Sequence, residues 1–112
     1  MINIRPRKPL RKIGKIGRAN IKANQLIAKL WEREGIDYCE LAKFIPQVIC
    51  VGFLPLQNCH RHDRYFYRDK LELLSDRGQV VRGCQNHHTF LDHHPKEKRE
   101  IFIKLRGVEI IN

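Results

Sequence analysis

The chain lacks any run of apolar residues that approaches the roughly 18 needed to cross a membrane, and no apolar run follows its basic amino end as in a signal peptide. We therefore expect no membrane partner and an intracellular, reduced protein, located in the cytoplasm, or in the host cell cytoplasm if the chain is phage-encoded. The 112 residues are too few for more than one domain. So small a domain buries a modest fraction of its surface, and a disulfide or metal staple would help to stabilise it.

Acidic residues are also scarce. The sequence has 12 Asp and Glu against 22 Lys and Arg, which gives a formal net charge of +10. This balance favours a polyanionic partner, and nucleic acid is the commonest one because neutralising its phosphates releases counterions. A solvated basic surface without a partner is the alternative. A basic amphipathic membrane binder fits less well, since the basic segment has no aromatic or leucine-rich face.

The first 18 residues contain no acidic residue at all. Pro6, Pro9, Gly14 and Gly17 are expected to interrupt any helix or strand there, so we predict a flexible basic arm over residues 1–18 and a folded domain over 19–112. The arm's cations are candidates for contacts with nucleic-acid phosphates, and a solubilising tail is the alternative. These cations are Arg5, Arg7, Lys8, Arg11, Lys12, Lys15 and Arg18.

A helix is predicted from Asn20 to Gly35. Asn20 can cap the free amides of the first turn, and Gly35 can adopt the left-handed conformation that follows a helix. Ile27, Leu30 and Trp31 follow the three-four spacing of an inward-facing stripe. We take this helix, Trp31 included, as part of the core.

Short strands and helices are predicted in the rest of the chain. One strand is expected within residues 54–64 and another from Val80, after a turn at residues 76–79. A short helix is expected to start over residues 85–91. Proline at its first position favours a last helix over residues 95–106, with a glycine to end it.

Four cysteines could form two disulfides or bind a metal ion. The six histidines favour the metal, because four of them cluster at positions 87, 88, 93 and 94 and the other two, His60 and His62, lie just after Cys59. Two residues separate Cys84 from His87, a gap that lets one tight turn direct two ligands at one ion. Cys39 and Cys50 would complete a Cys3His zinc site, with Cys59 as a competitor for a place in it. Ordinary buried thiols are the alternative.

A second group of candidate ligands follows the zinc motif. His88 is next to His87 but points in another direction, and Asp92 lies four residues later on the same helix face. This spacing suits two ligands of one divalent ion. His93 and His94 are further candidates.

The two remaining histidines are candidates for catalysis. On a strand, His60 and His62 would project from the same side, because side chains alternate between the two faces. A histidine near a metal-bound phosphate suits a general base, since its pKa lies close to neutrality and it can activate water.

Residues 39–106 resemble the phage-type HNH endonucleases. The ββα-metal fold of that family places a histidine-bearing first strand opposite a helix that begins at a Cys-x-x-Cys-His sequence. Four stretches carry the resemblance, which covers about 60 % of the chain. They are LQNCHRHDR at residues 56–64, LLSD at 73–76, VVRGCQNHH at 80–88 and FIKLRG at 102–107.

The resemblance implies an α+β fold: a small zinc-stapled ββα-metal domain with a preceding helix and a C-terminal helix. It implies hydrolysis of DNA phosphodiester bonds, with His60 as the general base and His88 as a ligand of a catalytic Mg²⁺ or another divalent ion, assisted by His62 or Asp92. It also implies a structural zinc. The zinc ligands would be Cys39, Cys50, Cys84 and His87. We add Arg61 and Arg64 to the residues expected to contact DNA.

Three positions depart from the family pattern. His87 stands where the family usually has cysteine, a change that zinc tolerates. Cys59 precedes the expected base where many members carry an aspartate or histidine ligand, and His62 could substitute for it. The family's middle asparagine has no clear counterpart, since Gly78 and Gln79 fall near its place.

Two other functions are compatible with the same residues. One is a catalytically inactive zinc-bound nucleic-acid-binding module of the same fold, which the departures at Cys59 and at the missing asparagine favour. The other is a protein-binding or inhibitory zinc module that uses its basic charge against an acidic partner. The presence of both His60 and His88 favours the nuclease. The sequence does not specify an oligomeric state.

Overall fold

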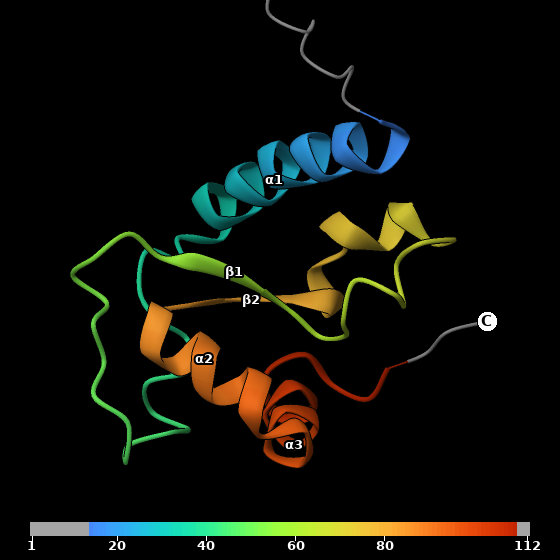
Figure 1. Ribbon diagram of the computed structural model, residues 1–112. Helices are drawn as coiled ribbons and strands as arrows, with labels where there is room; N and C mark the ends of the chain where they lie inside the picture. Colours follow the sequence, from blue (N-terminus) through green and yellow to red (C-terminus); the bar gives the residue numbers. More distant parts are fainter. Residues whose placement is uncertain (1–13, 110–112) are drawn as a thin grey trace, which may run out of the picture.

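The computed structural model describes residues 14–109. These residues form a small α+β domain, as expected, with three α-helices, two short 3-10 helices and a two-stranded antiparallel sheet (Figure 1). In chain order the elements are α1 (Lys15–Glu34), β1 (Gln57–His60), η1 (Leu71–Ser75), η2 (Arg77–Gln79), β2 (Val80–Gly83), α2 (Gln85–His93) and α3 (Pro95–Arg106). The cations Arg5, Arg7, Lys8, Arg11 and Lys12 of the expected arm lie outside the described residues.

The sheet separates two layers of helices. Figure 1 shows α1 on one side of the strands and α2 with α3 on the other. Val80 of β2 packs with Ile27, Leu30 and Trp31 of α1, whereas Val81 packs with Phe102 of α3 in the larger cluster. Alternation of side chains along β2 therefore gives each helical layer its own contact with the sheet.

The beginning of α1 differs from the expectation. The helix starts at Lys15 with Gly14 as its N-cap, not at Asn20, so Lys15 and Arg18 belong to a helix and the predicted arm boundary after residue 18 falls inside it. Gly17 costs only about 1 kcal/mol in a helix interior. Ala19, in the added turn, packs against the cluster that contains Tyr67 and Leu74, and this tertiary contact favours the longer helix.

The other end of α1 and the last two helices match the expectation. Gly35 ends α1 as its C-cap in the left-handed conformation, with φ 67°. Pro95 opens α3, which ends before Gly107, where φ is 85°. The first strand is shorter than expected, since β1 ends at His60 and His62 lies in the bend that follows. The expectation that both histidines share one face of one strand is therefore wrong.

Gly83 allows β2 to approach the core closely just before Cys84. A Cβ atom at this position would lie 2.7 Å from Leu41 Cδ1 and 3.0 Å from Cys59 Sγ. Glycine is thus required at this position because a larger residue would clash with Leu41 and Cys59, and not because of an unusual φ. The close approach brings the end of β2 against the segment that follows α1, where Cys39 lies.

No helix within residues 14–109 combines the length and the apolar composition that a membrane-spanning segment requires.

Candidate metal centre and histidine cleft

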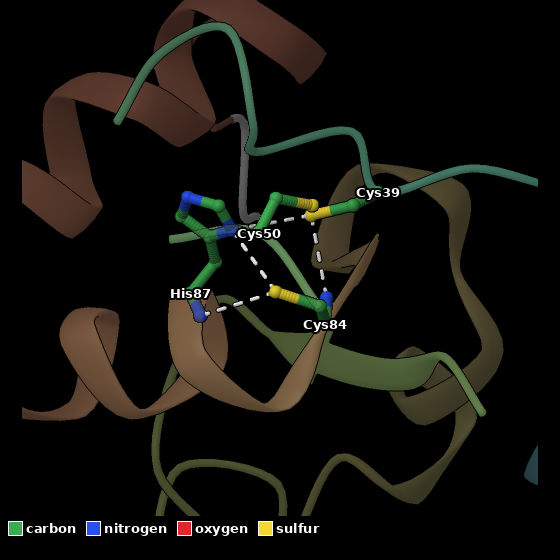
Figure 2. Close-up of side chains that lie close together, drawn as sticks. All are labelled: Cys39, Cys50, Cys84 and His87. Carbon is green, nitrogen blue, oxygen red and sulfur yellow. Dashed lines mark hydrogen bonds between the residues drawn. The ribbon is translucent and has the colours of Figure 1, made fainter. Parts of the chain in front are cut away.

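Three cysteines and one histidine from distant parts of the chain meet at one point. The thiol sulfurs of Cys39, Cys50 and Cys84 and a ring nitrogen of His87 all lie within 4.8 Å of one another. Figure 2 shows Cys84 and His87 at the beginning of α2, with Cys39 and Cys50 converging on them from the segment that joins α1 to β1. The spacing in the sequence predicted the pair Cys84 and His87, and Cys39 and Cys50 were expected to complete the set.

The α2 N-terminus places two of these side chains. Cys84 is the N-cap residue, and its sulfur accepts a hydrogen bond from the backbone amide of His87 at 3.4 Å. This hydrogen bond holds the Cys84 side chain in place, and the first turn of α2 positions the His87 ring beside its sulfur. His87 Nδ1 lies 3.0 Å from Cys84 Sγ and 3.5 Å from Cys39 Sγ. Around a tetrahedral zinc ion, neighbouring ligand atoms are separated by roughly 3–4 Å, so these distances fit.

The orientation of the His87 ring selects its metal-binding nitrogen. His87 Nε2 lies 3.0 Å from the carbonyl oxygen of Ile45. A carbonyl can only accept, so Nε2 carries the hydrogen and Nδ1, which faces the sulfurs, has the free lone pair. Outer hydrogen bonds of this kind fix the tautomer of metal-binding histidines. The ring is fully buried, and Ile45 was not anticipated from the sequence.

Glu40 positions Cys39. Its backbone amide donates to the Arg82 carbonyl at 2.8 Å, and its carboxylate accepts from the Arg82 amide at 2.9 Å. The same carboxylate pairs with the Arg106 guanidinium at 2.7 Å, and both side chains are buried. Glu40 therefore ties the segment that carries Cys39 to β2 and to the end of α3. Only the folded arrangement identifies this role, because nothing near Glu40 in the sequence indicates a partner.

The chemistry of the four donors fits zinc. Burial raises the pKa of the Cys39 thiol to about 11. Burial also acts to raise the pKa of Cys84, but hydrogen bonds from the backbone amides of His87 and Val51, together with the adjacent His87 ring, outweigh it and lower that pKa to about 7. Three sulfurs and one imidazole form the closed donor set of a structural zinc site. The cluster could thus bind a metal ion such as zinc.

Cys59 is not part of this cluster. Its side chain is fully buried between the strands and the α2–α3 layer, and burial raises the pKa of its thiol. All four cysteines are free thiols, so no disulfide joins them. Cys59 is therefore a core residue rather than a competing ligand.

A cleft of about 1060 Å³ brings together the histidines expected to be catalytic. His60, His62 and His88 line it together with Asp92. His93 and His94, the additional candidates, are exposed and are not among the residues that line it. The His94 ring instead stacks on Phe90 with the ring centroids 3.9 Å apart.

His60 is held with one ring nitrogen engaged. Its Nε2 lies 2.7 Å from the carbonyl oxygen of Leu74, at the end of η1. This nitrogen must carry the hydrogen, which leaves the Nδ1 lone pair available. Burial lowers the pKa of His60 below its usual value, and the charges of Lys98 and His88 act in the same direction. A neutral imidazole with a free nitrogen can accept a proton near neutral pH.

The loop that supplies the Leu74 carbonyl is stabilised by side-chain hydrogen bonds of Asp76 and Gln79. Asp76 Oδ1 accepts a hydrogen bond from the Gly78 amide at 2.9 Å and caps η2. The buried side chain of Gln79 accepts a hydrogen bond from the Tyr67 hydroxyl at 2.8 Å and donates one to the Glu109 carboxylate. Neither Asp76 nor Gln79 was assigned this role from the sequence.

His62 makes a contact with a carboxylate that the sequence did not indicate. Its Nε2 lies 2.7 Å from Glu109 Oε2, and its ring stacks on Phe66 with centroids 3.8 Å apart. Burial acts to raise the pKa of Glu109, but hydrogen bonds from Gln79 and His62 and the charge of Arg61 outweigh it and lower that pKa. Glu109 lies 47 residues from His62, so no local pattern could have linked them.

His88 is oriented by a residue of β1. Its Nδ1 lies 2.7 Å from the side-chain oxygen of Gln57, which accepts the hydrogen bond and leaves Nε2 with the free lone pair. Asp92 follows one helical turn later on α2, and its side chain is exposed. The two residues therefore offer an imidazole nitrogen and a carboxylate to the same cleft, as expected from their spacing.

The cations of the cleft differ in part from those expected. Arg64 lines the cleft and is exposed. The Arg61 side chain is only 7 % exposed, and its guanidinium donates to the carbonyls of Gly78 and Gly107, so it joins the loop to the end of α3. Lys98 and Arg99 of α3 also line the cleft, and sequence reasoning missed both. Their position depends on how α3 packs, which no spacing reveals.

Fold and site together define a small α+β domain with a candidate Cys3His metal centre and a histidine cleft that share helix α2. No family model, curated protein or solved structure matches the chain. Functional assignment therefore depends on the geometry of these two sites.

Proposed function

We propose that the chain is a metal-dependent DNA endonuclease of the HNH type, with a ββα-metal fold formed by β1, β2 and α2. The observation that carries the proposal is the orientation of His60. Its Nε2 is engaged by the Leu74 carbonyl, so that Nδ1 is left free as a proton acceptor in a cleft that also contains His88 and Asp92. A general base must combine a free nitrogen with a position beside the reacting phosphate. We also propose a cytoplasmic location.

The metal centre would have a structural role. The proposed zinc ligands are Cys39, Cys50, Cys84 and His87, which offer four protein donors and leave no open position for a substrate. Because Cys84 caps α2, this site would anchor the helix on which His88 and Asp92 stand. The zinc would thereby hold the cleft in shape without taking part in the reaction.

The cleft residues would divide the chemistry between them. His60 would take the proton from an attacking water molecule through Nδ1. When bound by His88, with Asp92 or His62 assisting, a divalent ion such as Mg²⁺ would polarise the scissile phosphate and stabilise the leaving oxygen. Two protein ligands suffice for Mg²⁺, which usually retains several waters. Lys98, Arg99 and Arg64 would contact neighbouring phosphates, since all three line the cleft.

The second candidate is an inactive zinc-bound nucleic-acid-binding module of the same fold. A specific observation favours it: within residues 14–109, the Cys3His set is the one group of three or more potential ligand side chains that gathers within 4.8 Å. Cys59, which stands where many family members carry a ligand, is buried in the core. DNA binding without cleavage would be the expected property of such a module.

A plasmid assay distinguishes the two candidates. Zinc-loaded protein is incubated with supercoiled plasmid and magnesium, manganese or nickel, alongside a sample with no added ion. The nuclease proposal expects nicked and linear products that require the added ion. Retarded but intact plasmid with every ion would instead support the inactive module.

Lys98 and Arg99 are expected to supply phosphate contacts. Replacing both by glutamine should weaken DNA binding and reduce the slope of log affinity against log salt by about 1.8, since each phosphate contact contributes about 0.9. Lys29→Gln with Arg33→Gln is the matched control, because it removes the same charge from exposed positions of α1. Equal slopes for the two double variants would show that α3 does not contact DNA.

A further inference from the structure

The turn after β1 exposes one aromatic ring between two arginines. Of the three consecutive aromatic residues at positions 65–67, Tyr67 is buried and Phe66 is half-buried, but the Tyr65 side chain is 76 % exposed. The Arg68 guanidinium carbon lies 5.1 Å from the centroid of the Tyr65 ring. Arg64, the residue before Tyr65 in the chain, lines the histidine cleft.

The position of this ring relative to the cleft is fixed by its neighbours. The Phe66 amide donates to Asp63 Oδ1 at 3.2 Å, and the Phe66 ring stacks on His62. The Tyr67 hydroxyl donates to Gln79 at 2.8 Å and accepts from the His62 amide at 3.2 Å. The turn is thus attached on its inner side to a cleft residue, and its outer side presents Tyr65. In Figure 1 the segment continues from the end of β1 toward η1.

Tyr65 belongs to none of the clusters that form the core, so its ring is free of packing contacts with them. An aromatic ring flanked by cations is the chemistry that recognises single-stranded nucleic acid. The base stacks on the ring while the cations contact the backbone. A base within a paired duplex already has stacked neighbours on both faces, so only an unpaired or extruded base can cover such a ring.

We propose that Tyr65 is a stacking platform for an unpaired base and that Arg64 and Arg68 contact the phosphates beside it. The inference rests on the proposed function, since it names the class of substrate that the cleft would receive. That substrate is DNA with unpaired bases next to the bond to be cut. Fully paired DNA would still bind through the cations but would leave the ring uncovered.

Stacking is tested with DNA that carries the fluorescent base 2-aminopurine, whose emission falls when the base stacks on an aromatic ring. The probes are a single-stranded oligonucleotide and the same oligonucleotide in a full duplex, with zinc-loaded protein and no magnesium. We expect quenching of the single strand by the wild type. Tyr65→Leu should lose the quenching and bind the single strand about tenfold more weakly, with unchanged binding of the duplex. Tyr65→Phe should retain both properties.

The control is Tyr38→Leu, which removes another exposed tyrosine, 57 % exposed, from the segment after α1. It should behave as the wild type. Quenching and single-strand affinity that are retained in Tyr65→Leu would overturn the stacking proposal, even if plasmid cleavage is observed. Conversely, stacking that depends on Tyr65 in a protein that cuts no DNA would uphold this inference while the nuclease proposal fails.

Discussion

His60→Ala is expected to abolish DNA cleavage while DNA binding and zinc content stay close to those of the wild type. Loss of a general base slows a reaction by about 10²–10⁴-fold. The substitution removes the free Nδ1 acceptor and a single hydrogen bond to the Leu74 carbonyl. It does not touch the cysteine cluster, so the folded domain should persist. Cleavage rates are measured on supercoiled plasmid at saturating protein, with binding measured separately without added magnesium.

Two further variants complete this test. His94→Ala removes an exposed imidazole that is not among the cleft residues and should cut at the wild-type rate. His88→Ala should also abolish cleavage and should in addition weaken binding of the exchangeable divalent ion, because it removes a proposed ligand instead of a base. If His60→Ala cuts as fast as the wild type, the base is assigned wrongly, and His62 is the next residue to replace.

Cys84→Ser is expected to release the metal ion and to unfold the domain. Structural zinc sites contribute about 10–16 kcal/mol of apparent binding free energy, which exceeds the stability of most small domains. Serine can still accept the hydrogen bond from the His87 amide that caps α2, so the loss of stability would report the loss of the metal ligand. Metal content per chain is measured by elemental analysis, and the thermal transition by circular dichroism.

The controls separate the metal centre from the rest of the core. Cys59→Ala removes a fully buried thiol outside the cluster and should keep one metal ion per chain, with a modest loss of stability. His87→Cys should also keep the ion, because a fourth thiolate is an ordinary zinc ligand. A Cys84→Ser protein that folds with wild-type stability would refute a structural metal at this site.

The sequence was sufficient to predict which residues form the cysteine–histidine cluster because half of that cluster is local. Two intervening residues place Cys84 and His87 on one helical turn wherever the helix lies. Cys39 and Cys50 were inferred only as natural partners, and the choice against Cys59 needed the fold. It depends on the register that sets Cys59 opposite Val81 and directs its sulfur toward Gly83.

The residues that orient the site could not be predicted, because their partners are distant in sequence. Gln57 contacts His88 across 31 positions, and Glu109 contacts His62 across 47. His60 depends on a backbone carbonyl, which no residue type reveals. The predicted start of α1 was wrong for a related reason. The low helix propensity of Gly17 was outweighed by the packing of Ala19 against Tyr67 and Leu74, which are distant in the sequence.

The buried ion pair between Glu40 and Arg106 would couple metal binding to DNA binding if the two sites act as proposed. Glu40 is adjacent to Cys39 in the metal centre, while Arg106 terminates the helix that carries Lys98 and Arg99 into the cleft. A conformation of α3 that suits a phosphate ligand is therefore also one in which the Cys39 segment is in place. By linkage, any increase in DNA affinity caused by the metal equals the increase in metal affinity caused by DNA. Bound DNA would thereby raise the affinity of the chain for its metal ion, although the DNA does not contact the metal site.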